Sequence, residues 1–427
     1  MKNNIEITTN ETLGETIHKK VLSNGLEVYI CVRPGFTKKI GMFGTKYGSI
    51  NNDFIDISNG KRVTMPDGIA HFLEHKLFEK EGENSLDLFS KEGISSNAYT
   101  SFDHTVYFFE TIDKFKKGLE MLIELVKTPY FTVENVKKEQ GIIGQEISMY
   151  EDDPNFNVYF NALRAMYINH PIRIDIAGTI ESISKIDKDI LYTCYNTFYN
   201  SNNMFIVIVG DVDVSDTISI IEDKLKLYEQ NIKSEKVMKF GVVEPTNILQ
   251  KKIEKDMGLF MPQLSIGYKL LPTKKNEIIK REVISDLISE MYFSKSSKFY
   301  ETEYNKGAVS DDIDFVYEGT TDFSHIIIST MSSKLDIIQA DIFKFIEELK
   351  SNEIDIKLFE NTKRRKIGEN IVESENSNNS YRRIIDSILN ESKLYYDLEI
   401  LSNITVEDIK DFLNTLEYSK AVISIVK

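Results

Sequence analysis

Cysteine is scarce in this chain, and the scarcity excludes a disulfide-stapled fold. Cys31 and Cys194 are the only two cysteines among 427 residues, so no disulfide framework is implied. Cys31 lies in a strand-like apolar run and Cys194 in a helical pattern. We therefore expect both to be buried apolar side chains rather than reactive thiols.

Long apolar runs are missing as well. Nowhere does the chain reach the roughly eighteen consecutive apolar residues that a membrane-spanning helix requires. Residues 1–10 contain no apolar core of the kind that a signal peptide needs. We expect a cytoplasmic protein with no membrane span.

Positive charge is in deficit. The chain has 52 lysines and arginines against 67 aspartates and glutamates, a formal net charge of -15. Nucleic-acid binding depends on a basic surface, so the composition argues against a nucleic-acid partner. An acidic surface attracts basic peptides at long range, although solubility alone also explains it. The length predicts two or three domains.

Histidine is scarce too, which makes one cluster informative. His71 and His75 are two of only six histidines, and with Glu74 they form the pattern H-x-x-E-H. In a helix, histidines four residues apart lie one turn apart on one face, a spacing that suits one metal ion. Glu74 borders that face, where it can reach a metal-bound water. The order is the reverse of the H-E-x-x-H zinc-protease helix. A chance pattern is the competing explanation until a third ligand is found.

The search for a third ligand leads to a second predicted helix. A catalytic zinc typically has three protein ligands, and residues 136–149 have helical spacing with Glu139 and Glu146 seven residues apart. These two carboxylates project from one helix face, two turns apart. A solvated charged face explains the pair equally well from periodicity alone. His104 lies in a strand-like run, where a lone histidine is more often structural than a ligand.

The remainder of the chain repeats one plan. A helical pattern followed by an apolar strand occurs at 186–198 and 204–210, and again at 404–413 and 420–426. We interpret this as two copies of one α+β unit of about 200 residues each.

The expected domains are a metal-bearing domain at 1–228, a polar linker at 229–252 and a homologous domain at 253–427, whose only histidine is His325. The pattern further predicts a hairpin at 17–32, a strand at 39–48, and helices at 113–128, 132–150, 180–199, 277–306, 335–350 and 354–395, the last interrupted at 374–380.

Several motifs together resemble the inverted-zincin peptidases of the pitrilysin and insulysin family, in particular its shorter bacterial members related to the mitochondrial processing peptidase. The resemblance runs nearly the full length of the chain. It rests on Gly-x-Ala-His-Phe-Leu-Glu-His at 68–75, Asn97-Ala98-x-Thr100-Ser101 with Tyr107, the Glu139/Glu146 pair, His170-Pro171 with Gly178-Thr179, and Asn203-Met204 leading to Val209-Gly210-Asp211.

The resemblance implies a role for each residue of the site. One Zn²⁺ per chain would be bound by His71, His75 and Glu146. Glu74 would be the general base, and Glu139 an outer carboxylate that orients a ligand histidine. Zinc bound in this way lowers the pKa of its water and polarises the scissile carbonyl.

The resemblance also implies how substrate binds. The predicted strand at 96–101 is similar to the family's edge strand, which accepts a peptide as an added β-strand. Asn97 and Ala98 are the substrate-binding residues that it implies. The expected fold is two tandem homologous α/β-sandwich domains, of the mitochondrial processing peptidase type, forming half of a clamshell chamber.

One family motif is absent. Many active relatives carry R-x-x-x-G-x-x-Y in the second half, where the arginine and tyrosine help to bind the substrate backbone and the transition-state oxygen. The corresponding stretch here, anchored on Gly307, begins with Glu303 and ends with Ser310. This departure predicts a heterodimer in which a homologous two-domain subunit supplies the arginine and tyrosine, with a homodimer as the alternative.

The sequence thus predicts a zinc-dependent endopeptidase that cleaves unfolded peptides, leader peptides or small proteins inside a dimeric chamber. In the mechanism expected, a zinc-activated water attacks and Glu74 is the general base. The alternative function is a non-catalytic, peptide-binding scaffold subunit of a processing-peptidase-like complex.

Overall fold

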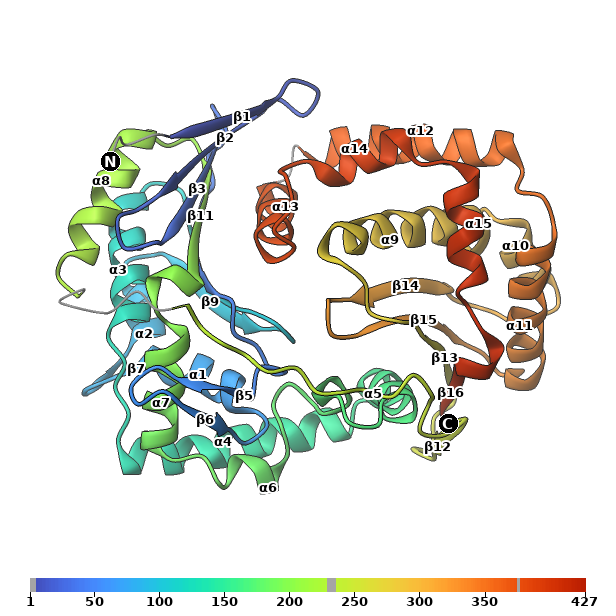
Figure 1. Cartoon of the computed structure of the whole chain (residues 1–427), viewed down its shortest axis with the longest axis horizontal. Helices are drawn as coiled ribbons and strands as arrows, with labels where there is room; N and C mark the ends of the chain where they lie inside the picture. The colour runs from blue at the N-terminus through green and yellow to red at the C-terminus, as the bar shows by residue number, and fades with distance from the viewer. Residues whose placement is uncertain (1–4, 229–235, 375–376) are drawn as a thin grey trace. The chain divides into compact units, whose positions relative to one another are not determined.

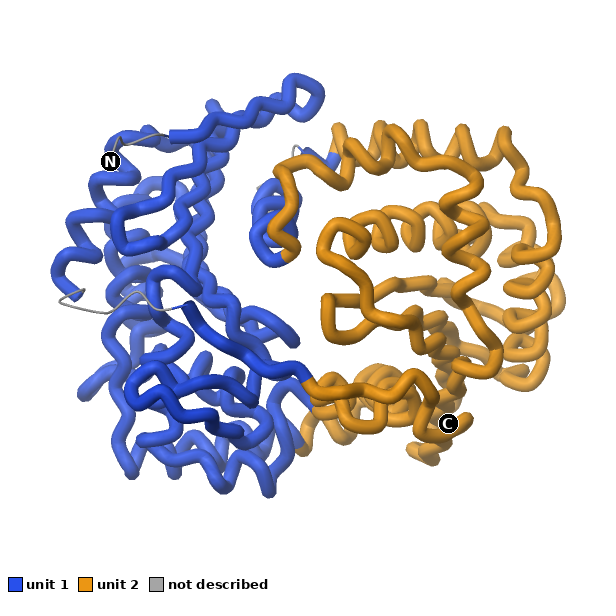
Figure 2. The backbone as a smooth tube through the Cα atoms, in the orientation of Figure 1, with its two compact units in different colours: residues 1–147, 175–241, 373–389 blue, residues 148–174, 242–372, 390–427 orange. Residues whose placement is uncertain are grey.

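The chain folds into two compact units that exchange segments. The computed structural model describes residues 5–228, 236–374 and 377–427. Unit 1 comprises the described parts of 1–147, 175–241 and 373–389, and unit 2 those of 148–174, 242–372 and 390–427 (Figure 2).

Unit 1 is built around a seven-stranded sheet in the order β1-β2-β3-β11-β4-β10-β9 (Figure 1). Its strands are β1 (Glu6–Asn10), β2 (Glu15–Val21), β3 (Glu27–Val32), β4 (Lys39–Thr45), β9 (Ser95–Thr100), β10 (Thr105–Thr111) and β11 (Met204–Gly210). Strands β3 and β11 are parallel, and the other pairs are antiparallel. All seven residues of β11 are buried, as expected for a central strand covered on both faces.

The helices of unit 1 bury their apolar faces against this sheet and one another. They are α1 (Ile69–Phe78), α2 (Ser85–Lys91), α3 (Phe115–Lys127), most of α4 (Val133–Glu151), α6 (Ile180–Ile183), α7 (Lys188–Phe198), α8 (Val214–Leu225) and α13 (Ser377–Leu389). Two small hairpins complete the unit: β5 (Asp53–Asp56) with β6 (Lys61–Thr64), and β7 (Glu79–Lys80) with β8 (Glu83–Asn84).

Unit 2 has a five-stranded sheet in the order β12-β16-β13-β15-β14. Its strands are β12 (Lys252–Lys255), β13 (Gln263–Lys269), β14 (Asp314–Gly319), β15 (Ser324–Met331) and β16 (Ala421–Val426). Its helices are α5 (Pro154–Met166), α9 (Lys275–Ile288), α10 (Lys298–Asn305), α11 (Leu335–Ser351), α12 (Ile356–Glu373, all but its last residue), α14 (Tyr396–Asn403) and α15 (Val406–Asn414).

The five strands of the second sheet correspond to five consecutive strands of the first, β3-β11-β4-β10-β9, as the sequence repeat predicts. In each, a parallel pair, β3/β11 or β12/β16, is followed by three antiparallel strands. Each half of the chain also gives one helix to the other unit. Helix α5, from the first half, packs on β13 and β16, and α13, from the second half, packs on β11 and β3.

This exchange corrects the contiguous domain boundaries 1–228 and 253–427 predicted from the sequence. Residues 148–174 belong to unit 2 because α5 buries its apolar face, including Leu163 and Met166, against the second sheet. Of the predicted linker 229–252, residues 229–235 lie outside the described residues; the part from 242 onwards belongs to unit 2.

Three predicted helices are divided. The helix predicted at 180–199 is two helices, because Asp187 accepts hydrogen bonds from Asp189 and Ile190 and so caps α7 as a new start. The helix predicted at 277–306 is interrupted by a π-helical turn at Ser289–Phe293, and that at 354–395 divides into α12 and α13.

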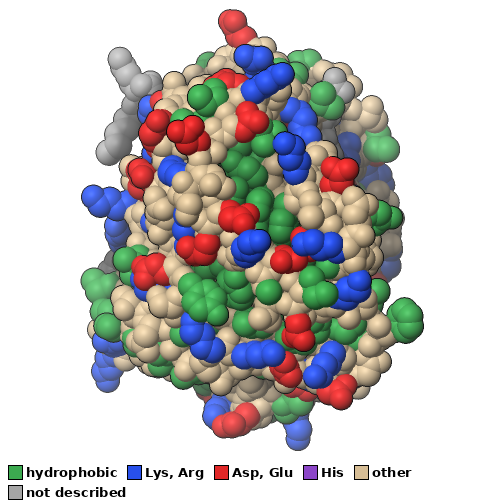
Figure 3. All heavy atoms as spheres, turned by 90° about the vertical axis from the view of Figure 1, so that its right-hand side faces the viewer, with side chains coloured by type: hydrophobic (Ala, Val, Ile, Leu, Met, Phe, Trp, Pro, Cys, Tyr) green, Lys and Arg blue, Asp and Glu red, His purple; other side chains and the backbone are tan. Residues whose placement is uncertain are grey.

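Two other expectations concern burial and the membrane. Cys31 and Cys194 are both free and buried, as predicted. Among the described residues, no helix combines the length and apolar content that crossing a bilayer demands. On the face of unit 2 in Figure 3, basic and acidic side chains are interspersed around small hydrophobic areas.

Candidate metal centre

Helix α1 carries the histidine motif, and a close backbone approach sets its start. Gly68 precedes the helix with a φ of 87°, and a Cβ there would lie 2.3 Å from the Ala177 carbonyl oxygen. Ser182 donates a hydrogen bond of 2.8 Å from its Oγ to the Asp67 carbonyl oxygen. Only glycine fits this contact, which explains why Gly68 and Gly178 accompany the histidine motif.

The helix presents both histidines toward α4. Its apolar side chains, including Phe72, Leu73 and Leu77, are fully buried in the core of unit 1. His71 and His75 project from the remaining face, with ring centroids 4.5 Å apart. The amphipathic spacing of α1 therefore determines where the imidazoles point.

Glu146 on α4 meets both imidazoles. His71 Nε2 lies 3.7 Å from Glu146 Oε1, and His75 Nε2 lies 3.5 Å from Glu146 Oε2. One potential ligand atom from each of the three side chains lies within 4.8 Å of the other two. Among the described residues, no other set of three histidine, cysteine or carboxylate side chains comes together in this way.

The arrangement fits zinc. In a tetrahedral site with zinc–ligand distances of about 2.0–2.1 Å, donor atoms lie about 3.3 Å apart. The two histidine–glutamate separations, 3.5 and 3.7 Å, are within a few tenths of an ångström of that value. Two imidazoles and one carboxylate also leave a fourth position open, as in catalytic zinc sites.

The protonation of the two histidines differs. Burial lowers the pKa of His71 to about 3, helped by the neighbouring His75, so His71 is neutral and ready to bind a cation. Burial also lowers the pKa of His75, but the hydrogen bond to Glu139 and the charges of nearby glutamates outweigh it and leave the pKa raised. A metal would therefore compete with a proton at His75.

Glu139, on the same face of α4, contacts His75 from the other side. Its Oε1 lies 3.1 Å from His75 Nδ1, and the side chain is buried. Burial raises the pKa of Glu139, but the interactions with His75 and Lys76 outweigh this effect and lower it. An ionised Glu139 accepts a hydrogen bond from His75 Nδ1–H, and this tautomer leaves the Nε2 lone pair available to a metal.

Glu74 is buried beside the donor group and is tied to the edge of the sheet. Thr100 Oγ1 on β9 donates a hydrogen bond of 2.6 Å to Glu74 Oε2. Burial raises the pKa of Glu74, and this hydrogen bond opposes the effect. A carboxylate with a raised pKa is a better proton acceptor near neutral pH.

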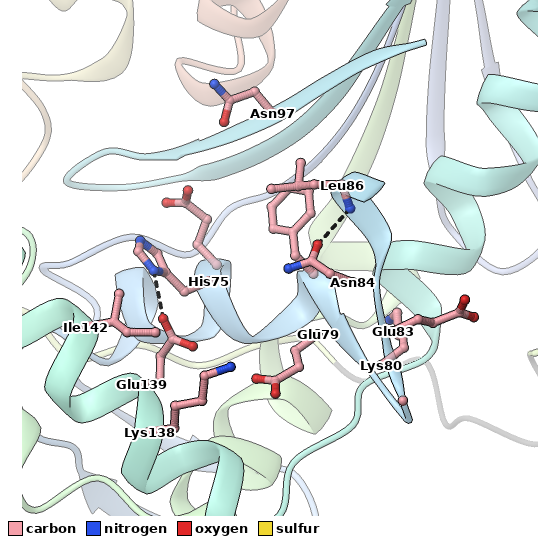
Figure 4. A pocket seen from close by; sticks show the side chains of 13 residues that line it. His75, Glu79, Lys80, Glu83, Asn84, Leu86, Asn97, Lys138, Glu139 and Ile142 are labelled. Atoms are coloured by element: carbon pink, nitrogen blue, oxygen red, sulfur yellow. Dashed lines mark hydrogen bonds and ion pairs between the residues drawn. The ribbon is translucent and has the colours of Figure 1, made fainter. Parts of the chain in front are cut away.

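A cavity of about 550 Å³ opens next to these groups (Figure 4). Its lining includes Glu74, His75, Glu139 and Asn97, together with residues of the β7–β8 hairpin. Figure 4 shows His75 and Glu139 pointing toward each other below β9, while the Asn97 side chain extends from β9 on the far side.

Strand β9 is the last strand of its sheet and pairs only with β10 among the described strands. Asn97 Oδ1 accepts a hydrogen bond of 2.8 Å from the Ala98 backbone N–H. Asn97 and Ala98 thus lie on the edge strand of the described sheet, which is joined through Thr100 to the motif helix. His104 is not part of the donor group; it pairs with Asp103 at 2.7 Å.

Comparison with known proteins identifies the family. Residues 54–180 match the family described as insulinase (peptidase family M16), and residues 185–366 match the peptidase M16 inactive domain. The chain is 38% identical to an uncharacterized zinc protease of Bacillus subtilis strain 168, YmfH, over 94% of both chains. The chain belongs to the M16 peptidase family.

Solved structures of M16 proteins share the fold. One described as M16-like, from Alicyclobacillus acidocaldarius, has a TM-score of 0.91 and 30% identity, covering 100% of this chain and 99% of its own. Pitrilysin matches with a TM-score of 0.76 at 16% identity, and 100% of this M16 chain covers 47% of the pitrilysin chain. All three members of the donor group lie in the segment that matches the insulinase family.

The structure brings together every residue predicted for the metal site, and adds two that the sequence analysis did not assign. Thr100 holds Glu74, and Lys76 lies 3.6 Å from Glu139 Oε2. Thr100 lies in the quoted strand motif, but nothing in its spacing signals the contact. Lys76 directly follows the motif, where a charged residue suggests exposure.

Proposed function

We propose that this M16 protein is a zinc-dependent endopeptidase that cleaves unfolded peptides, leader peptides or small proteins in the cytoplasm. The observation that carries the proposal is the convergence of His71, His75 and Glu146, with the carboxyl group of Glu74 held beside them. When bound, zinc supplies Lewis acidity that polarises a carbonyl group and acidifies a water molecule.

The protein's own residues supply the remaining chemistry. Thr100 occupies Oε2 of Glu74, so Oε1 is the oxygen that takes up the proton of the attacking water and returns it to the leaving amine. Glu139 fixes the tautomer and orientation of His75. The free edge of β9 aligns the peptide backbone through main-chain hydrogen bonds, which demand little of the substrate sequence.

We further propose that the chamber is dimeric and that a homologous two-domain partner completes it. Pitrilysin, in which this chain matches 47% of the length, is about twice as long. Glu303, which stands where active relatives have arginine, is 1% exposed and its Oε1 lies 2.7 Å from Lys306 Nζ. It therefore cannot supply a guanidinium group, and Ser310 cannot supply a phenol.

A cleavage assay on matched variants tests the proposal. We expect the wild type to bind about one zinc per chain and to cleave a quenched unfolded peptide. Glu74→Gln should keep the zinc and lose activity by about a hundredfold or more. Glu83→Gln, an exposed carboxyl at the rim of the same cavity, is the control and should behave as wild type.

The alternative function is a non-catalytic, peptide-binding scaffold subunit. It predicts that wild type and Glu74→Gln bind peptides equally well and that neither cleaves them, even with a partner present. Cleavage that survives in Glu74→Gln would contradict the assignment of the base.

A further inference from the structure

A lysine side chain is sealed inside the protein next to the metal centre. Lys76 follows His75 on α1, and its side chain is 0% exposed, among the largest fully buried side chains of the described residues. Burying an ammonium group costs several kcal/mol unless it is paired and hydrogen-bonded. Its environment must therefore compensate the charge.

Three acceptors surround the Lys76 ammonium group. It contacts the Glu79 carboxylate, lies 3.6 Å from Glu139 Oε2, and donates a hydrogen bond of 3.3 Å to the Asn135 carbonyl oxygen. The hydrogen bonds to Glu79 and Asn135, together with the ion pair with Glu139, compensate the buried charge. Two of them, Glu139 and Asn135, belong to α4, the helix that also carries Glu146.

The two oxygens of Glu139 are thereby divided between two partners. Oε2 faces Lys76, and Oε1 faces His75 Nδ1 at 3.1 Å. Rotation of the Glu139 carboxylate would break both contacts in a buried environment, where unpaired charges are costly. Lys76 therefore holds the plane of the Glu139 carboxylate so that it accepts a hydrogen bond from His75 Nδ1–H. His75 Nε2 then remains directed at Glu146.

We propose that Lys76 is a positioning residue of the metal centre, acting through Glu139 to hold His75 in the orientation and tautomer that bind zinc. This inference rests on the proposed function. It goes beyond the roles predicted from the motif, because the position after H-x-x-E-H has no ligand or base role there.

Removal of the Lys76 ammonium group can change zinc affinity in two ways, through electrostatic repulsion or through positioning of a ligand, and the two changes have opposite signs. Removing a nearby positive charge strengthens the binding of a cation by Coulomb's law. Loss of an outer contact that orients a ligand weakens metal affinity, commonly by tenfold to a hundredfold. Lys76→Met keeps most of the length of the side chain and removes the ammonium group, which carries both the positive charge and the contact with Glu139. The two effects of this substitution on zinc affinity therefore have opposite signs.

The test measures the zinc dissociation constant by competition with a chelating dye, in wild type, Lys76→Met, Glu139→Gln and the double variant. We expect each single variant to bind zinc about tenfold or more weakly. Because Lys76 acts through Glu139, the two losses should not add. The zinc dissociation constant of the double variant should equal that of the single variant with the lower zinc affinity. The Co²⁺-substituted absorption spectrum should change in the same variants, and Lys76→Arg should restore part of the affinity.

A second buried lysine supplies the control. Lys20, 8% exposed, pairs with Glu222 at 2.7 Å elsewhere in unit 1. Lys20→Met should lower the melting temperature without changing zinc affinity or the Co²⁺ spectrum.

Two results would overturn the inference. One is unchanged or tighter zinc binding in a folded Lys76→Met protein, and the other is additive losses in the double variant. Failure of the wild type to bind zinc would instead overturn the proposed function, so the two failures are distinguishable.

Discussion

The contact between Thr100 and Glu74 joins the proposed base to the proposed substrate strand. A hydroxyl that donates to a carboxylate stabilises its ionised form, and this hydrogen bond opposes the rise in pKa that burial causes at Glu74. The same contact holds the carboxyl group in place relative to β9, so a peptide added to that edge would meet a base already oriented.

The first prediction concerns this contact. In Thr100→Val the Glu74 pKa should rise further, because burial is then unopposed by the hydroxyl. The acidic limb of the pH profile of kcat/KM should therefore move to higher pH, with a larger rate loss at pH 6 than at pH 8. The control is Ser96→Ala, which removes from the same strand a hydroxyl that donates to the Phe108 carbonyl oxygen. An unmoved acidic limb would contradict the role of Thr100.

The second prediction concerns a buried histidine in unit 2. Burial, opposed by the charge of Glu244, lowers the pKa of His170 to about 4, and His325 and Lys269 add to the lowering. Between pH 6.5 and 4 the unfolded chain binds this proton and the folded chain does not. Folding stability should therefore fall as the pH drops through that window, by up to about 3 kcal/mol.

Thermal melts between pH 4 and 7 check this prediction. His170→Gln should flatten the pH dependence of the melting temperature relative to wild type. If the melting temperature of His170→Gln depends on pH as strongly as that of wild type, the prediction is contradicted and other groups, such as Glu244, account for the dependence.

At this scale, the sequence could predict only part of the metal centre. His71, Glu74 and His75 share one helical turn, so their spacing alone places them together. Periodicity puts Glu139 and Glu146 on one face of α4, but only tertiary packing, or a family resemblance, says that this face meets α1. Lys76 was unpredictable because lysine is seldom buried without partners, and its partners come from a different helix.

At the scale of elements, the exchanged helices α5 and α13 connect the two halves of the chain. Helix α13 places Ile384, Ile385 and Ile388 in buried positions and packs on β11 and β3 of the metal-bearing unit. Ser380 also donates a hydrogen bond of 2.5 Å to Glu15, which pairs with Arg33 at 2.8 Å. Unit 1 therefore depends on residues far from it in sequence.

The third prediction follows from this exchange. Ile384→Ala, in the C-terminal half, should destabilise unit 1 by about 3 kcal/mol through the lost burial and the cavity. Hydrogen exchange should show faster exchange of the β3 and β11 amides than in wild type, with the amides of β13 and β16 little changed. Ile346→Ala, equally buried in unit 2, should give the reverse pattern. If Ile384→Ala instead lowered the hydrogen-exchange protection of unit 2 alone, the assignment of α13 to unit 1 would be contradicted.

Sequence patterns located most elements but not this exchange. The strands predicted at 204–210 and 39–48 follow from apolar runs and glycines, and both form, the second as Lys39–Thr45. The side on which α5 packs depends on contacts with a sheet about a hundred residues further along the chain, which periodicity does not encode. For the same reason, the predicted contiguous domains were wrong at 148–174 and 373–389.

At the scale of the whole molecule, the proposed partner is the main prediction. Alone, the chain should cleave a quenched peptide slowly, because neither Glu303 nor Ser310 can replace the family's arginine and tyrosine. Addition of a homologous two-domain M16 chain that carries R-x-x-x-G-x-x-Y and lacks H-x-x-E-H should raise the rate by about a hundredfold or more. Sedimentation should show a 1:1 complex, and full activity of the isolated chain would contradict the heterodimer.

The central claim is that His71, His75 and Glu146 bind one zinc ion, and metal analysis of the purified chain tests it most directly. The account predicts about one zinc per chain in wild type and in His104→Ala, and much less than one in His71→Ala with the fold intact by circular dichroism. A wild-type chain that takes up no zinc, or a His71→Ala chain that keeps it, would contradict the account.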